Sequence, residues 1–270
     1  MLPEKIFFFF FGSIVGSFLN VCIHRLPLGE SIISPGSHCP KCNKPIPWYY
    51  NIPLISYIAL LGRCRFCREK ITFRYFAVEL LTALAFLTFF IKLGFIFDLL
   101  VYIVFTCGLI VATFVDIQHR IIPDEISIGG IVAGLFFSVI KGIFLTSRPG
   151  QLAPIINSFL GIIIGGGVIF LTGFLFDLIY FKLLKKPAIQ GETESMGGGD
   201  VKLLAMIGAF LGWQTALIVF FLAPFFGAAV GLVNMLVKKD HVIPYGPFLS
   251  LAAIICIFWS DKILQIVFLR

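Results

Sequence analysis

The sequence has little charge. Only 13% of its 270 residues are Asp, Glu, Lys or Arg, whereas 59% are hydrophobic and the mean hydropathy is +1.02. This composition excludes a water-soluble domain of that size, so we expect an all-α polytopic membrane protein surrounded by lipid. The net charge of +7 does not indicate nucleic-acid binding, because the basic residues cluster in short loops between apolar segments, as membrane topology requires.

Other features are also scarce. The four histidines have no metal-ligand spacing, and the sequence has no evident internal repeat or low-complexity tract. No small-residue cleavage site follows the N-terminal apolar segment, which runs into Leu26-Pro27 and a polar loop. We therefore interpret this segment as a retained first span and not as a removed signal peptide.

Eight apolar stretches approach the length of about 20 residues that a membrane span needs. The sixth is short, and Gly212-Trp213-Gln214 after it predicts a tight turn at an interface. An even number of spans would place both termini on the same side of the membrane. The stretches cover residues 5–25, 76–93, 97–115, 125–145, 155–181, 201–212, 214–237 and 246–268.

The polar loop 26–75, between the first and second spans, carries two Cys-x-x-Cys pairs separated by 21 residues. This pattern is typical of a four-thiolate zinc site, and four protein ligands make the ion structural. Nearby basic residues, such as Arg63 and Lys70, are expected to lower the pKa of the thiols. The alternatives are a redox dithiol and a pair of disulfides. The proposed ligands are Cys39, Cys42, Cys64 and Cys67, while Cys22, Cys107 and Cys256 are interpreted as small core residues.

The cysteine loop also predicts sidedness. Zinc-binding thiolates require a reducing compartment, which favours a cytoplasmic loop. With the loop inside, 15 of the 21 Lys and Arg residues lie on the cytoplasmic side and six lie outside. The positive-inside rule favours the same orientation independently.

The sequence has only 14 acidic residues, and two of them, Asp116 at the end of the third span and Asp200 at the start of the sixth, lie on the predicted cytoplasmic side. Two carboxylates brought close share one proton, so that one activates water while the other polarises a peptide carbonyl. The run Gly197–Gly199 before Asp200 would let an extended peptide approach the acid, and Lys202 follows it. Alternatively, each aspartate is a solvated cap or interface residue, and the sequence alone does not bring together residues 84 positions apart.

Several motifs, in order, resemble those of bacterial prepilin peptidases, the type IV leader peptidases of pilus and type II secretion systems. The resemblance covers nearly the whole chain. It rests on the cysteine pairs and on residues 12–27, 74–83, 116–124 and 194–203; the last of these contains Gly197-Gly198-Gly199-Asp200, similar to the Gly-x-Gly-Asp motif of membrane aspartic proteases. The long polar stretch 182–195 departs from the family pattern.

The resemblance implies that Asp116 and Asp200 are the catalytic pair, with Gly197, Gly199 and Lys202 in the active-site loop. The substrates would be prepilins or pseudopilins, cut after a short basic leader at the cytoplasmic face of the bacterial inner membrane. Related enzymes with the cysteine loop also methylate the new N-terminal residue with S-adenosylmethionine. The resemblance assigns that activity to residues 1–95 and cleavage to 96–270. The candidate methyl-transfer residues are Gly16, Asn20, Arg25 and Glu79.

Two other classes of membrane protein remain as alternatives, a transporter and a scaffold. A transporter would also place acids at helix breaks, but it should carry ionisable groups near the bilayer midplane, where these spans have almost none. A zinc-loop membrane scaffold of a pilus or secretion complex would not need Asp116 or Asp200.

Overall fold

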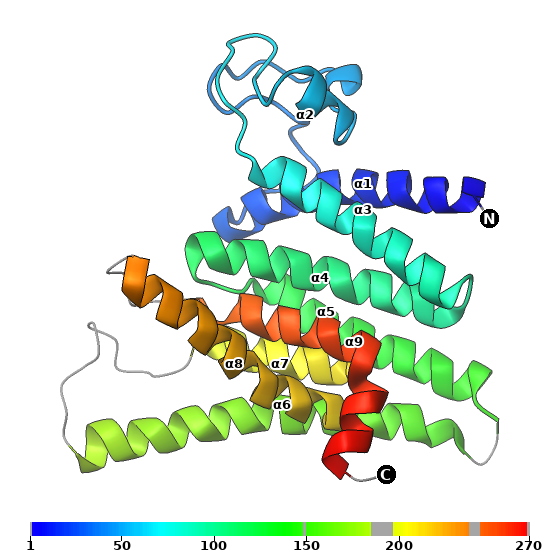
Figure 1. Ribbon diagram of the computed structural model, residues 1–270, viewed down its shortest axis with the longest axis vertical. Helices are drawn as coiled ribbons and strands as arrows, with labels where there is room; N and C mark the ends of the chain where they lie inside the picture. Colours follow the sequence, from blue (N-terminus) through cyan, green and yellow to red (C-terminus); the bar gives the residue numbers. More distant parts are fainter. Residues whose placement is uncertain (1, 148–149, 185–196, 238–243, 269–270) are drawn as a thin grey trace. The chain divides into compact units, whose positions relative to one another are not determined.

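The computed structural model describes residues 2–147, 150–184, 197–237 and 244–268. Within these ranges the chain is helical and forms no strand, only the isolated bridges His38–Pro45 and Arg63–Lys70 (Figure 1). The all-α prediction is therefore confirmed. The longer helices are α1 (Leu2–Arg25), α3 (Arg74–Leu93), α4 (Phe97–His119), α5 (Asp124–Ile140), α6 (Ala153–Asp177), α7 (Gly198–Leu211), α8 (Trp213–Val237) and α9 (Gly246–Phe268).

Short helical segments complete the chain. They are η1 (Leu26–Leu28), η2 (Trp48–Tyr50), α2 (Ile55–Ala59), η3 (Lys141–Leu145), η4 (Gly150–Leu152) and η5 (Leu178–Leu183). Most of the polar stretch 182–195 lies outside the described residues.

Six helices in the described ranges are long and apolar enough to cross a membrane, so the chain is a polytopic membrane protein. The helix α7 is not among them: its 14 residues extend about 21 Å at 1.5 Å per residue. The described apolar part of α9 is also short, Gly246–Trp259. The six segments are Leu2–Leu28, Arg74–Leu93, Phe97–His119, Asp124–Leu145, Gly150–Tyr180 and Trp213–Val233.

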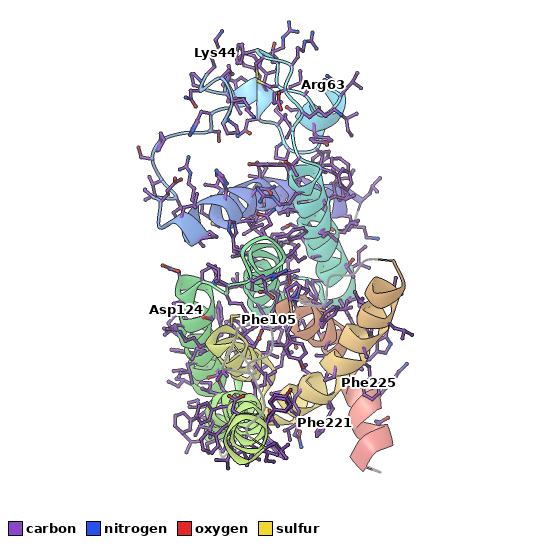
Figure 2. The ribbon with its side chains drawn as sticks, turned by 90° about the vertical axis from the view of Figure 1, so that its left-hand side faces the viewer. Lys44, Arg63, Phe105, Asp124, Phe221 and Phe225 are labelled. Atoms are coloured by element: carbon purple, nitrogen blue, oxygen red, sulfur yellow. The ribbon has the colours of Figure 1, made fainter. Side chains whose placement is uncertain are left out.

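The chain divides into two compact units, Met1–Val111 and Ala112–Arg270, with the boundary inside α4. We call them unit 1 and unit 2. In unit 1, α1 packs along α3 (Figure 1). A Cβ atom on Gly16 would lie 2.7 Å from the Cα of Glu79, so glycine is what lets the two backbones approach. The loop that carries Lys44 and Arg63 extends beyond the ends of these helices (Figure 2).

In unit 2 the short helix α7 packs against α5, α6, α8 and α9. Its Leu203, Leu204 and Ile207 are fully buried. The closest approach is to α6, where a Cβ atom on Gly208 would collide with the backbone carbonyl of Gly161. The surrounding helices therefore shield α7, which explains how an apolar helix shorter than a span is accommodated.

The helix α8 shows the opposite pattern on its outer face. Phe221 and Phe225, one turn apart, are 65% and 72% exposed and point away from the helix bundle (Figure 2). Large exposed aromatic side chains at this spacing fit contact with lipid. The predicted turn between α7 and α8 is present, because Gly212 has a φ of +83°, which ends α7 and lets α8 begin at Trp213.

Candidate functional site

The first acidic motif lies where α4 ends. Asp116 is in the last turn of the helix and is only 6% exposed. Arg120 has a φ of +56° and its N–H donates to the Asp116 carbonyl, which closes the helix. The chain then passes through Ile122 and Pro123, and α5 begins at Asp124.

The second motif forms the start of α7. Gly197 has an extended conformation and precedes the helix, so Asp200 lies in the first helical turn. The sequence suggested that this glycine run makes room for a peptide. In the structure the space beside Gly199 is taken by the chain itself, since a Cβ atom there would lie 3.2 Å from the Cβ of Ile122.

These contacts bring the two motifs together. The ammonium group of Lys202 on α7 lies 2.6 Å from the Asp124 carboxylate at the start of α5, and both side chains are partly exposed. With the Gly199–Ile122 contact, this ion pair holds the start of α7 against the segment that links α4 to α5.

The carboxyl groups of Asp116 and Asp200 interact. The pKa of Asp200 is raised to about 7, first because burial disfavours its charged form and second because the negative charge of Asp116 lies nearby. Near neutral pH this pair can hold one proton between two carboxylates, which is the charge state that acid–base hydrolysis requires.

A third segment contributes to the site, and the sequence analysis missed it. The backbone N–H of Gly246, the first residue of α9, donates a 2.9 Å hydrogen bond to Oδ2 of Asp116. The pKa of the preceding Tyr245 is raised to about 12, by burial and then by the charge of Asp200. The available signal was the Pro244-Tyr245-Gly246-Pro247 turn between a polar stretch and the last apolar helix.

The two cysteine pairs in unit 1 adopt one common backbone arrangement. Cys39 and Cys64 each accept a hydrogen bond at their carbonyl from the residue four positions later, and each donates its N–H to the residue five positions later. The residue that follows each pair, Asn43 or Arg68, has a positive φ, of 53° and 61°. Two such knuckles present their four sulfurs to one point.

The four Sγ atoms lie within 4.8 Å of one another, and those of Cys39 and Cys67 are 3.8 Å apart. A tetrahedral zinc with Zn–S bonds of about 2.3 Å requires sulfur–sulfur distances of about 3.8 Å, so the tetrad fits a zinc ion. All four are free thiols in the structure, not disulfides. The pKa of Cys64 is lowered to about 7, chiefly by the backbone N–H of Cys67 and not by the basic side chains that the sequence suggested.

The two knuckles are also in contact through a lysine side chain and an aromatic ring. The ammonium group of Lys44, after the first pair, lies 5.3 Å from the ring centroid of Phe66 in the second pair, a cation–π contact. This contact ties the knuckles together without using a sulfur.

Three of the four methyl-transfer candidates cluster between α1 and α3. Asn20 donates to the carbonyl oxygens of Gly16 and Tyr75, while its buried Oδ1 has no hydrogen-bond partner among the described residues. Gly16 contacts the backbone of Glu79, and the Glu79 carboxylate accepts the Leu54 N–H at 2.8 Å.

The fourth candidate, Arg25, has a different environment. Its guanidinium donates to the carbonyl oxygens of Ser31 and Pro35 at 2.8 and 2.7 Å. Arg25 therefore fastens the start of the cysteine loop to the end of α1.

Comparison with known proteins identifies the family. Residues 10–93 match the bacterial peptidase A24 N-terminal domain, and residues 103–232 match the type IV leader peptidase family. The chain is similar to proteins named prepilin leader peptidase/N-methyltransferase. It is 34% identical to the protein of Aeromonas salmonicida, in a match that covers 94% of this chain and 90% of the relative. It is 32% identical to the protein of Pseudomonas aeruginosa, in a match that covers 93% of this chain and 89% of that relative.

A third such protein, from Myxococcus xanthus, is 36% identical over 86% of this chain and 63% of its own length. No solved structure matches the chain. The chain belongs to the type IV leader peptidase family.

Proposed function

We propose that the chain is a prepilin leader peptidase and N-methyltransferase, an aspartic endopeptidase of the bacterial inner membrane. It cleaves the short basic leader from prepilins or pseudopilins and then methylates the new N-terminal residue. The interaction of the Asp116 and Asp200 carboxyl groups carries the peptidase assignment, because two residues 84 positions apart meet in one partly buried site. The names of the relatives support the substrate and the second activity.

The chemistry needs no metal at the scissile bond. The ionised carboxylate removes a proton from a water molecule, and the resulting hydroxide attacks the peptide carbonyl carbon. The protonated carboxyl group gives its proton to the carbonyl oxygen, which forms a neutral tetrahedral diol. On collapse the C–N bond breaks, the leaving amine takes a proton, and the pair regains its single shared proton.

The residues of the proposed active-site loop position the two aspartates. Gly199 lets the start of α7 lie close to Ile122, and Gly197 leads into the helix beside the Asp200 carboxyl, whose Oδ2 would lie 3.8 Å from a Cβ atom at that glycine. Lys202 pairs with Asp124 and keeps the two motifs in register. We place this loop, and the cysteine loop, on the cytoplasmic side, supported by the excess of Lys and Arg there.

The tetrad Cys39, Cys42, Cys64 and Cys67 would hold a structural zinc ion. Zinc would cross-link two knuckles that otherwise share few buried side chains, and four sulfur ligands leave it no open position for catalysis. The loop is joined to the helices at Arg25 and at Glu79, which binds the Leu54 N–H.

We assign methyl transfer to residues 1–95 and cleavage to 96–270, supported by the separate matches over 10–93 and 103–232. S-adenosylmethionine supplies the methyl group when bound. The buried acceptor Oδ1 of Asn20 and the carboxylate of Glu79 offer oxygen atoms to a cationic donor, and Gly16 lets α1 and α3 approach closely beside them. Arg25 contributes by holding the loop.

The test is cleavage of a model prepilin, with a short basic leader before an apolar helix, by purified protein in liposomes. Mass spectrometry with S-adenosylmethionine present should show a product without its leader and a further shift of one methyl group. Asp116→Asn and Asp200→Asn should give neither cleavage nor methylated product, while both fold. Normal processing by either variant would overturn the aspartate assignment and favour the scaffold alternative.

A further inference from the structure

The two carboxyl groups of the proposed catalytic pair have unequal surroundings. Oδ2 of Asp116 accepts the Gly246 N–H in a buried hydrogen bond of 2.9 Å. In the described part of the chain, the Asp200 carboxyl accepts no such hydrogen bond, and its environment consists of burial and the nearby charge of Asp116. The pair is therefore asymmetric before any substrate binds.

The donor to Asp116 belongs to a helix N-terminus. Gly246 is the first residue of α9, and the first N–H groups of a helix have no acceptor within the helix. They also carry the positive end of the helix dipole, which favours a negative charge beside them. Asp116 therefore receives both a direct hydrogen bond and the field of α9.

Glycine is required here for space and not for backbone conformation. Gly246 does not have a positive φ. A Cβ atom at this position would lie 3.4 Å from Cγ of Asp116 and 2.8 Å from its Oδ2, and the second distance is closer than real Cβ contacts come. The volume that a side chain would take is thus filled by the carboxylate itself.

We propose that Gly246 is a positioning residue: its N–H and the start of α9 hold Asp116 as the ionised, water-activating member, which leaves Asp200 as the protonated member that acts on the peptide carbonyl. This assignment rests on the proposed peptidase function. The other titratable groups nearest the pair on the neighbouring elements include Tyr245, His119 and Arg120 at the end of α4, Glu125 at the start of α5, and the ion-paired Lys202 and Asp124.

The first experiment tests the contact without using activity. Thermal unfolding is measured for wild type, Gly246→Ala, Asp116→Ala and the double variant. The added methyl group should lower Tm in wild type, because overpacking is destabilising, and should have little effect once Asp116 is alanine. Equal losses in both backgrounds, or failure of both Gly246→Ala proteins to fold, would overturn the proposal. Gly129→Ala, where a Cβ meets nothing within 4 Å, is the matched control.

The second experiment tests the role in the reaction. Prepilin cleavage by wild type, Gly246→Ala and Gly129→Ala is followed from pH 5 to pH 9. We expect Gly246→Ala to lower kcat about 10- to 100-fold with KM nearly unchanged, because the base is misplaced. Its acidic limb should move to higher pH by about one unit, since the N–H no longer favours the ionised carboxylate. A lower rate with an unshifted profile would mean a merely structural glycine and would overturn the proposal.

The two kinds of failure are distinguishable. If wild type does not cut the model prepilin, or if Asp116→Asn still cuts it, the peptidase function is wrong. If wild type cuts, the Asp variants do not, and Gly246→Ala behaves like Gly129→Ala, only the role of Gly246 is wrong.

Discussion

The cysteine tetrad of unit 1 and the aspartate pair of unit 2 are assembled in different ways. Each knuckle of the tetrad is made by hydrogen bonds between residues four or five positions apart, and both knuckles lie in one loop. The aspartate site instead draws on the end of α4, the start of α7 and the start of α9, and one of its hydrogen bonds joins residues 130 positions apart. A site built locally tolerates changes in the helices, whereas a site built from distant segments depends on how they pack.

The largest expected effect is the loss of prepilin cleavage when either aspartate of unit 2 is replaced, with no change in the zinc bound by unit 1. Asp116→Asn and Asp200→Asn should each lower prepilin cleavage about 10³-fold or more, because each removes one half of the acid–base pair. Neither change touches the cysteine loop, so the zinc content of the purified protein should stay at the wild-type level. Cleavage is read by mass spectrometry and zinc by elemental analysis; cleavage within tenfold of wild type by either variant would refute the pairing.

The reverse experiment removes the metal. Cys39→Ser/Cys64→Ser should reduce zinc from about one ion per chain to none, since two ligands cannot hold it. The protein should retain part of its peptidase activity, because the aspartates lie in unit 2. Cys256→Ser, which replaces a buried cysteine of α9 outside the tetrad, should keep its zinc. Zinc retained by the double variant would show that these are not the ligands.

The two activities should also respond to pH in opposite directions. The pKa of Asp200 is raised to about 7, so its proton is present below pH 7 and is lost as the pH rises through that value. Cleavage should therefore fall about 50-fold between pH 7 and pH 9. Methylation of a pilin supplied without its leader should rise over the same range up to about pH 8, because the attacking amine must be unprotonated. A cleavage rate that keeps rising above pH 7 would contradict this.

Replacing Gly16 should have a smaller effect, which lowers the rate of methyl transfer and leaves the rate of cleavage nearly unchanged. In Gly16→Ala the new Cβ atom would meet the backbone of Glu79 at 2.7 Å, so α1 and α3 must move apart. We expect about a tenfold loss of methyl transfer and a cleavage rate within a few-fold of wild type. Gly36→Ala, in open space within the same unit, is the control. Equal loss of both activities would mean that the two regions are not independent.

The smallest effect concerns the exposed ion pair. Lys202→Met removes the partner of Asp124, and exposed pairs of this kind contribute about 1 kcal/mol or less. Cleavage should fall no more than about five-fold, and the loss should shrink at high salt, where the wild-type pair is itself screened. A loss as large as that of Asp200→Asn would give Lys202 a direct part in the chemistry.

The same contrast explains what the sequence could predict. The cysteine tetrad was predictable because the Cys-x-x-Cys spacing and its turn lie within a few residues, and the structure brings the four sulfurs together. The α-helical class and most span boundaries follow from apolar runs. The composition of an apolar stretch does not show whether lipid or protein surrounds it. Residues 201–212 were therefore expected to form a span, whereas α7 is short and is surrounded by other helices.

The contribution of Gly246 could not be predicted from local sequence. A glycine between Tyr245 and Pro247 is compatible with any helix N-terminus. Its role depends on the position of Asp116 in the folded protein, which the local sequence does not give. At Gly199 the tertiary contact is with Ile122, a neighbour that the glycine run alone did not indicate. In both cases only the tertiary contact showed what occupies the space beside the glycine.

The length of α7 bears on how water reaches the acid pair. A helix of about 21 Å does not reach across about 30 Å of hydrocarbon, and the helices packed around α7 shield it from lipid. The remaining depth at the end that carries Asp200 would then be filled by water, which peptide hydrolysis consumes. A short, enclosed helix thus gives a protease inside a membrane its supply of solvent.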